Sequence, residues 1–371
     1  MSERAAERVT RRGFDYLLLG AVLILLGFGL VMVLSASGVM AEKFMGNKYH
    51  FFIRHAGFSV AGLLVMAIAW VIPRDKIFTL TYVWLVGVML LLALTLWSPL
   101  GHSAGGASRW LRAGPFSLQP LELAKLALVI YLAYFYSTKQ ELLDSISVAL
   151  VPPLLITGSL SMLLLLQPDF GGAAFLLLLM FLMALAGGVR LAHLGFAATT
   201  LALTAAMLVI QSPYRMRRMF AFMDPFVDPL NTGYQLVQSL YALGSGQVFG
   251  VGLGAGKQKL FFLPEAHNDF LMAVIGEELG FVGVSAIFLL VGVVLWRGFA
   301  IAWTRSEMLD RLLAFGLTCV LGLGFLLNMA VTLGAAPPKG VPMPFVSYGG
   351  SSLIVSFATL GLLLNLSRSE E

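Results

Sequence analysis

The stretch DYLLLGAVLILLGFGLVMVLSAS, residues 15–37, decides the fold class. Its only charged residue is Asp15, at its first position. About 20 apolar residues are enough to cross a bilayer as a helix. An Arg-rich segment precedes the stretch and no small-residue cleavage site follows it, so we interpret it as a retained membrane span and not as a signal peptide.

The composition of the whole chain agrees with this interpretation. Of the 371 residues, 59% are hydrophobic and only 12% are charged, whereas about 25% are charged in a typical soluble domain. No compact core could bury so much apolar surface, so lipid must surround much of the chain. The single cysteine, Cys319, excludes an internal disulfide. Nothing in the sequence indicates a nucleic-acid partner.

Similar apolar runs recur along the chain and predict an all-α, polytopic membrane protein, because each lipid-facing span must satisfy its own backbone hydrogen bonds. We expect one membrane unit over residues 1–371, with no separate soluble domain. The predicted spans, about ten, lie near residues 15–37, 55–73, 78–98, 119–136, 146–166, 172–188, 195–212, 270–296, 312–333 and 353–367.

The charges around the first span suggest how the chain is oriented. The tail 1–14 carries Arg4, Arg8, Arg11 and Arg12, which favours a cytoplasmic N-terminus. An even number of spans then places the C-terminus inside as well. The outer segments become 38–54, 99–118, 167–171, a large loop at 213–269 and a proline-rich loop at 334–352. These segments hold about half of the cations, which suits an anionic ligand or anionic lipid headgroups.

One outer segment, FFLPEAHNDFLMAVIGEELG (261–280), gathers acids at the start of a span. Asp269 has two interpretations: a helix cap that accepts from free backbone N–H groups, or a functional carboxylate. Glu277 and Glu278 lie about 12 Å into the span at 1.5 Å per residue. Acids at that depth mark a functional site by default, and a structural ion pair is the alternative.

Two further segments bring charges to the same side. GGASRWLRAGPFSLQPLELAK (105–125) places Arg109 and Trp110 in an outer loop, with Trp110 suited to anchor at the interface. In the helix that follows, Glu122 and Lys125 share a face and can pair, for a functional or a purely structural reason. QPDFGG (167–172) places an acid between two spans, where a cap or turn is the simplest interpretation.

The remaining candidates are a proline-rich and a basic segment. APPKGVPMPFVSYGGSS (336–352) can line a cavity as re-entrant backbone and offer N–H groups to an anion, or it can be a plain loop. YRMRRM (214–219) suits an interfacial helix or a phosphate clamp. The five histidines are scattered, and no HExxH motif, cysteine pair or P-loop occurs, so ATP-driven transport is not indicated.

Taken together, these motifs resemble those of the SEDS proteins (shape, elongation, division and sporulation), the peptidoglycan glycosyltransferases of the bacterial inner membrane. The resemblance covers nearly the whole chain and includes the long segment 224–280. The PPKG sequence before SYGGSS is closer to the P-T-K-G of the division member than to the P-V-T-G of the elongation member. Asn268 stands where the family usually has Thr, and Leu121 where it usually has Ser, which puts any role of that Ser hydroxyl in doubt.

The resemblance implies that the chain joins the sugars of lipid II, a disaccharide-pentapeptide on a polyprenyl diphosphate, into glycan strands at the outer face. Asp269 matches the essential Asp of the family and would be the general base. A divalent cation, Mg or Mn, is a candidate cofactor for the leaving diphosphate, and no organic cofactor is expected. The residues that we predict to bind substrate are Arg109, Trp110, Glu122, Lys125, Arg215, Arg218, Lys257, Lys259, Glu265, His267, Lys339, Ser347, Ser351 and Ser352.

The resemblance also implies partners and a place in the cell. A class B penicillin-binding transpeptidase and other membrane proteins of the division machinery are the expected partners. The expected location is the inner membrane at the division septum, with both termini cytoplasmic. The alternatives are an elongation-type polymerase, a lipid II flippase and a scaffold without chemistry of its own.

Overall fold

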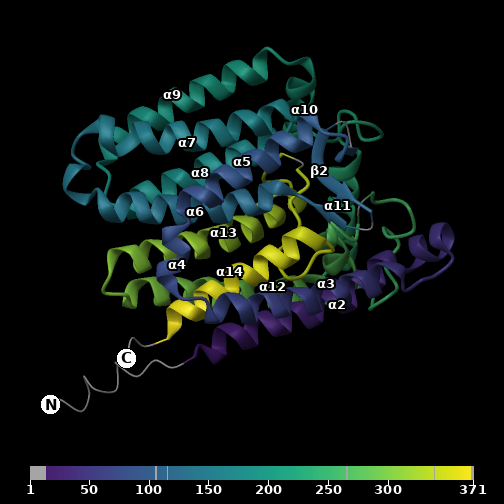
Figure 1. The fold of residues 1–371 in the computed structure, drawn as a ribbon. Coiled ribbons are helices and arrows are strands. Elements are labelled where there is room, and N and C mark those ends of the chain that lie inside the picture. The colour runs from purple at the N-terminus through teal and green to yellow at the C-terminus, as the bar shows by residue number, and fades with distance from the viewer. Residues whose placement is uncertain (1–13, 105–106, 115, 265, 338, 369–371) are drawn as a thin grey trace.

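The computed structural model of the chain describes residues 14–104, 107–114, 116–264, 266–337 and 339–368. They form a bundle of long helices with one small sheet (Figure 1). In chain order the elements are α2 (Tyr16–Met45), α3 (His50–Val71), α4 (Arg74–Thr79), α5 (Thr81–Trp97), β1 (Gly101–Ala104), β2 (Ala107–Ala113), β3 (Phe116–Leu118), α6 (Pro120–Thr138), η1 (Gln140–Leu142), α7 (Ile146–Leu166), α8 (Phe170–Ala186), α9 (Leu191–Ile210), α10 (Pro213–Met223), α11 (Tyr234–Gly246), α12 (Leu271–Thr304), α13 (Met308–Thr332) and α14 (Gly350–Ser367).

The helices confirm the predicted polytopic membrane fold. Within the described residues, eight helices are long and apolar enough to cross a membrane, and α5 and α8 are shorter apolar helices. Each of the two has 17 residues, which is at the lower limit for a span, about 17–25 residues. These helices account for all of the predicted spans.

Several predicted boundaries are wrong because hydropathy locates the lipid and not the helix end. The sequence predicts an outer loop at 38–54, but α2 continues through it to Met45 and α3 begins at His50. Gly46 ends α2 in the left-handed region at φ 67°, a conformation that glycine adopts at little cost. Likewise α12 continues beyond the predicted end at 296 to Thr304.

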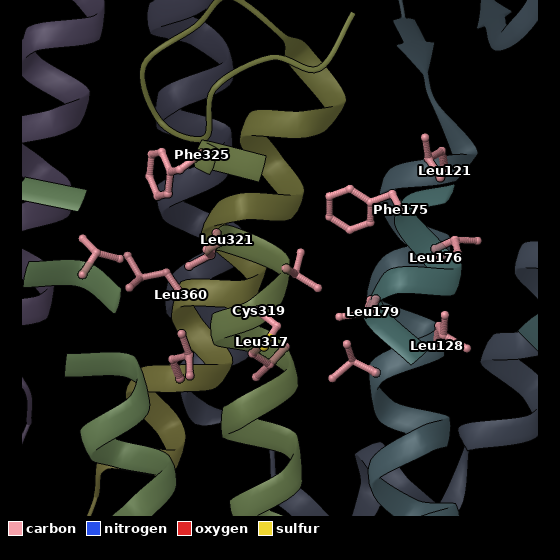
Figure 2. Packing of buried hydrophobic residues seen from close by; sticks show 14 of the residues in the cluster. Leu121, Leu128, Phe175, Leu176, Leu179, Leu317, Cys319, Leu321, Phe325 and Leu360 are labelled. Atoms are coloured by element: carbon pink, nitrogen blue, oxygen red, sulfur yellow. The ribbon is translucent and has the colours of Figure 1, made fainter. Parts of the chain in front are cut away.

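The core of the bundle lies between α6, α8, α13 and α14. Over an apolar stretch of 18 residues, 83% of the residues of α13 are buried, against 11% of those of α9. Helix α13 is therefore central in the bundle and α9 is peripheral. Figure 2 shows buried side chains of this core, among them Leu128 of α6, Phe175 of α8, whose ring points toward α13 and α14, and Leu321 of α13. These side chains are 0%, 2% and 1% exposed, and the packing fixes the helices that carry the charged residues described below.

The two ends of the bundle differ in character. The start of α2 and the end of α14 lie at one end, and the sheet, α10 and α11 lie at the other (Figure 1). The predicted irregular loop 99–118 contains the antiparallel sheet β1-β2-β3, which hydropathy alone does not reveal. The predicted large loop 213–269 contains α10 and α11, and α11 packs on α12 where Gly246 meets the backbone of Gly276.

Candidate active site

Asp269 lies at the end of the bundle that carries the sheet, immediately before α12. The N-cap residue of α12 is Phe270, which makes no side-chain cap hydrogen bond, so the interpretation of Asp269 as a helix cap is wrong. Asn328 of α13 holds this backbone in place. Its Nδ2 donates to the carbonyl of Asp269 at 2.9 Å and to the carbonyl of Val341 at 2.7 Å.

This bridge brings the proline-rich loop onto Asp269. A Cβ atom on Gly340 would lie 2.7 Å from Oδ2 of Asp269, closer than side chains approach one another. The backbone of residue 340 therefore rests against the carboxylate, and only glycine leaves it room. The segments that the sequence singled out separately, 261–280 and 336–352, meet at this point.

A cluster of charges from three segments lies at the same end. Arg109 of β2 has Nε 3.7 Å from Oδ2 of Asp169 and donates from Nη2 to the carbonyl of Pro168 at 3.0 Å. Asp169 also caps α8, because its Oδ1 accepts from Gly172 N at 2.9 Å. The cap interpretation of QPDFGG is therefore confirmed, and the same carboxylate also attracts a cation.

Glu122 and Lys125 form the buried pair that their spacing predicts. Lys125 Nζ lies 2.7 Å from Glu122 Oε1, and each side chain is 7% exposed. The ammonium also lies 4.6 Å from the centre of the Phe175 ring, a cation–π contact. With both charges satisfied, the pair fixes the first turn of α6 near the other charges.

Lys339 connects this cluster to the proline-rich loop. Its side chain lies over Gly171 at the start of α8, where a Cβ atom would collide with it. Burial lowers the pKa of Lys339 to about 8, the carboxylates of Asp169 and Glu122 act to raise it, and Lys125 and Arg109 act to lower it. Lys339 is thus electrostatically coupled to the whole cluster, in which three cations face two carboxylates.

An aromatic group borders Asp269 on the side of α3. The ring of His267 lies 4.6 Å from Phe51 and 5.6 Å from Tyr348, centre to centre. Tyr348 N also donates to the carbonyl of His267 at 3.1 Å. Burial lowers the pKa of His267 to about 4, so its imidazole is neutral at pH 7 and packs without adding a cation.

The predicted serines lie at the start of α14 and just before it. Ser351 Oγ accepts from Gln119 N and donates to the carbonyl of Ser117, both at 3.0 Å, so it joins α14 to the β3–α6 connection. Ser352 is buried in the same turn. Ser347 is buried, and its Oγ has no hydrogen-bond partner among the described residues.

Glu277, Glu278 and Lys259 form a second polar group, which holds a loop. Glu278 is 0% exposed, and it pairs with Lys259 Nζ at 2.7 Å and accepts from Ser35 Oγ and Gly254 N. Glu277 accepts from the backbone N–H of Lys257 at 2.7 Å. These contacts favour the structural alternative for both acids. They also occupy the ammonium of Lys259, so we correct its assignment from substrate binding to structural support.

The other predicted residues have varied positions. Lys257 is exposed beside the second polar group. Trp110 lies within β2, opposite His102 of β1. Glu265 and the side chains of Arg215 and Arg218 lie outside the described part of the structure.

Sequence reasoning missed three residues that shape the site: Gly171, Gly340 and Asn328. The glycine signals were present in QPDFGG and PPKG, because glycine marks close approaches of the backbone. Asn328 lies inside an apolar helix, and a buried amide needs partners, but nothing in the sequence indicates which carbonyls it binds.

The arrangement suits proton transfer to Asp269 from a bound molecule that carries a negatively charged group nearby. Asp269 offers a carboxylate, and Asn328 holds the backbone of this residue in place. Lys339, next to Gly340 in the chain, brings the cationic cluster close to that carboxylate. A group that gains negative charge during a reaction would be stabilised by such cations.

Comparison with known proteins decides the family. Residues 16–371 match the family described as "Cell cycle protein", which takes its designation from FtsW, RodA and SpoVE. The chain belongs to this family.

Members of the cell cycle protein family resemble the chain over almost its full length. A protein of Thioalkalivibrio sp. (strain K90mix), named "Probable peptidoglycan glycosyltransferase FtsW", is 43% identical over 364 residues, which is 97% of this chain and 91% of that protein. A protein of Geobacter sp. (strain M18) with the same name is 41% identical, over 96% of this chain and 97% of its own.

Solved structures of similar proteins share the fold of this chain. One chain from a peptidoglycan synthase complex, described as coordinating polymerization and crosslinking, has a TM-score of 0.77 and 32% identity, with 95% of this chain and 97% of that chain covered. The rod shape determining protein RodA of Thermus thermophilus has a TM-score of 0.70 and 31% identity, with 96% and 98% covered.

Proposed function

We propose that this chain is a peptidoglycan glycosyltransferase that polymerises lipid II into glycan strands. Its family membership and the names of its relatives support this function. The structural observation that carries it is the contact of the Asp269 carboxylate with Gly340, which places the acid next to Lys339 and its cluster of charges.

The reaction needs two groups that this site supplies. The acceptor sugar hydroxyl attacks the anomeric carbon of the donor, a new C–O bond forms, and the bond from that carbon to the diphosphate oxygen breaks. Asp269 takes the hydroxyl proton, and general-base help of this kind is worth about 10²–10⁴ in rate. The polyprenyl diphosphate leaves with the bonding electron pair, and Lys339, Arg109 and exposed Lys257 supply positive charge for it.

A divalent cation belongs to this proposal only as a companion of the substrate. Among the described residues, no three His, Cys, Asp or Glu side chains come together as metal ligands. Mg²⁺ is commonly held by one or two carboxylates together with substrate phosphates. In this proposal the diphosphate of lipid II would therefore supply most of the ligands of such a cation.

We assign the activity to septal wall synthesis, because the relatives from Thioalkalivibrio and Geobacter carry the FtsW name. The expected place is the inner membrane at the septum, with the Asp269 end outside and both termini cytoplasmic. A transpeptidase of the penicillin-binding type is the expected partner, since one similar chain comes from a complex that couples polymerization to crosslinking. An elongation role is the alternative, and cells depleted of the protein distinguish the two by filamenting or by rounding.

The decisive experiment compares purified wild type, Asp269→Ala and Asp269→Asn with lipid II in vesicles. We expect both variants to lose glycan polymer by about 10²-fold or more. Asp75→Asn, an exposed acid at the opposite end of the bundle, is the matched control and should retain activity. Polymer at the wild-type level from a folded Asp269 variant would exclude this residue as the base. Movement of labelled lipid II across the vesicle without any polymer would favour a flippase.

A further inference from the structure

Helix α12 is broken at Gly280, and the segment 247–252, which follows α11, fills the break. Gly280 has φ 64° and ψ −161°, a backbone conformation that is open essentially to glycine alone. Gln247, at the end of α11, also has a positive φ, of 48°, which is uncommon for a residue with a side chain. Strained backbone persists only where its surroundings hold it, and it gathers at functional sites, so these residues suggest a role for the break.

The segment 247–252 takes the hydrogen bonds that the broken helix leaves open. In an unbroken helix, the N–H groups of residues 281 and 282 would donate to the carbonyls of residues 277 and 278. Here the segment pairs with all four groups. The bonds, 2.9–3.1 Å long, run from Phe281 N to Gln247 O, Val282 N to Val248 O, Val251 N to Glu277 O and Gly252 N to Glu278 O. Irregular backbone inside a membrane protein is tolerated where its polar groups are satisfied in this way.

The break also divides α12 into two parts with different surroundings. Residues 271–278, before the break, are all buried, whereas Phe281 and Val282, directly after it, are 67% and 51% exposed. Protein therefore encloses the first part of α12. A Cβ atom added to Gly280 would lie 2.6 Å from the carbonyl oxygen of Val248, closer than side chains approach backbone. The direction of the first part is thus fixed by the break and by the segment that fills it.

The first part of α12 carries Asp269 at its start, so its direction determines where that carboxylate lies. Asp269 precedes Gly280 by 11 positions, which is about 16 Å at 1.5 Å per residue. Over that length a rotation of about 4° at Gly280 moves Asp269 by about 1 Å, and such a displacement can cost about 10²-fold in rate. Asn328 holds the other end of this part through the carbonyl of Asp269, so the two supports together define its position.

We propose that the break at Gly280 and the segment 247–252 position Asp269 for proton transfer, with Gly280 and Gly250 as positioning residues. This inference rests on the proposed function, in which Asp269 is the general base. Gly250 has φ 78° and lies against α12, because a Cβ atom added to it would be 2.5 Å from Leu279 N. In this proposal neither glycine contacts substrate, and both act on the reaction through the direction of the first part of α12.

The first test compares alanine substitutions of three glycines in α12, with lipid II in vesicles. Gly280→Ala strains the break, and Gly298→Ala makes a collision with the buried side chain of Thr318 in α13. Gly292→Ala is the neutral control, since no described residue comes within 4 Å of its added Cβ. We expect Gly280→Ala to lower kcat per folded molecule at least tenfold and to change KM by less than about twofold. Gly298→Ala should lower the thermal unfolding midpoint and keep kcat, and Gly292→Ala should keep both.

A matched pair in the loop tests the same role if Gly280→Ala fails to fold. Gly250 and Gly254 both have a positive φ, 78° and 83°, but only Gly250 lies against α12. Around Gly254, no atom of the described residues is within 4 Å of an added Cβ. Alanine at either position therefore brings similar backbone strain, and only Gly250→Ala displaces the segment 247–252 from the break. We expect kcat of Gly250→Ala to be at least tenfold below that of Gly254→Ala.

Hydrogen exchange separates this inference from the proposed function. The backbone amides of Phe281 and Val282 should exchange faster in Gly250→Ala than in Gly254→Ala, because their acceptors move away. If wild type makes no polymer from lipid II, the proposed function fails and the positioning role fails with it. If wild type is active, equal kcat in Gly250→Ala and Gly254→Ala, or a lower kcat without faster exchange at these amides, would overturn the positioning role alone.

Discussion

At the scale of single residues, Gly340 tests whether the position of the Asp269 carboxylate matters. A Cβ atom at residue 340 would lie 2.7 Å from Oδ2 of Asp269, so Gly340→Ala must displace the carboxylate. Because a misplacement of about 1 Å can cost about 10²-fold in rate, we expect kcat to fall at least tenfold while the protein stays folded. The measurement is the rate of glycan polymer formation.

Gly20 provides the control for that substitution. It lies in α2 with nothing within 4 Å of an added Cβ, so Gly20→Ala should leave polymer formation unchanged and, because alanine favours a helix more than glycine, should not lower stability. If Gly340→Ala polymerises lipid II as fast as Gly20→Ala, the contact with Asp269 has no role in the reaction.

Lys339 gives the site a dependence on pH. Its pKa of about 8 lies below the ordinary value of 10.5 because of burial, so its ammonium loses its charge as the pH rises through about 8. We expect kcat/KM, which reports the free enzyme, to fall above that pH if the charge meets the diphosphate. Lys339→Arg, whose guanidinium stays charged, should shift the fall to higher pH, and identical profiles would exclude Lys339.

The same depressed pKa has the opposite effect on stability. Between about pH 8 and 10.5 the unfolded chain binds a proton at Lys339 that the folded chain does not, so this residue makes the fold more stable as the pH rises through that window. Below pH 8 its burial is a constant cost. A loss of activity above pH 8 is therefore not explained by unfolding through Lys339.

At the scale of elements, the ion pair between Lys259 and Glu278 joins the loop before Asp269 to α12 and, through Ser35, to α2. Breaking a buried pair by removing one partner costs about 3–5 kcal/mol. We therefore expect Lys259→Met and Glu278→Gln each to lower the thermal unfolding midpoint clearly.

The double variant and a neighbouring lysine complete this test. Lys259→Met combined with Glu278→Gln should cost less than the two single effects added, because no charge remains unpaired. Lys257→Met should reduce lipid II polymerisation without changing the unfolding midpoint, since its side chain is exposed. Strict additivity of the two buried substitutions would show that Lys259 and Glu278 act separately.

The elements also show how much of the structure can be predicted from the sequence. Apolar length predicted every membrane helix, and the i,i+3 spacing predicted the Glu122–Lys125 pair, because both depend on local physics. The sheet at 101–118 and the ion pair between Lys259 and Glu278 depend on which segments meet in space, which the local sequence does not indicate. Charge alone therefore could not separate a structural lysine from one that faces substrate.

At the scale of the whole molecule, the two ends have separate tasks. The Asp269 end collects the sheet, the proline-rich loop and a cationic cluster, while the opposite end is held by the Arg297–Asp15 and Arg74–Asp310 ion pairs. The sequence predicts about half of the cations on each side of the membrane, and the two ends of the bundle correspond to this division. At one end cations cluster near the candidate catalytic acid, and at the other they pair with acids.

The orientation of these ends in the membrane can be tested with the single cysteine of the chain. Cys319 is buried, and Cys319→Ala removes its background. In that chain, Lys257→Cys places an exposed thiol at the Asp269 end, and Glu141→Cys, in η1, places one at the opposite end. If lipid II is polymerised outside, a thiol reagent that cannot cross membranes should label Lys257→Cys in intact spheroplasts. It should label Glu141→Cys only after permeabilisation, because the intervening bundle spans the bilayer. The reverse pattern would place Asp269 in the cytoplasm, where the proposed polymerisation could not deliver strands to the wall.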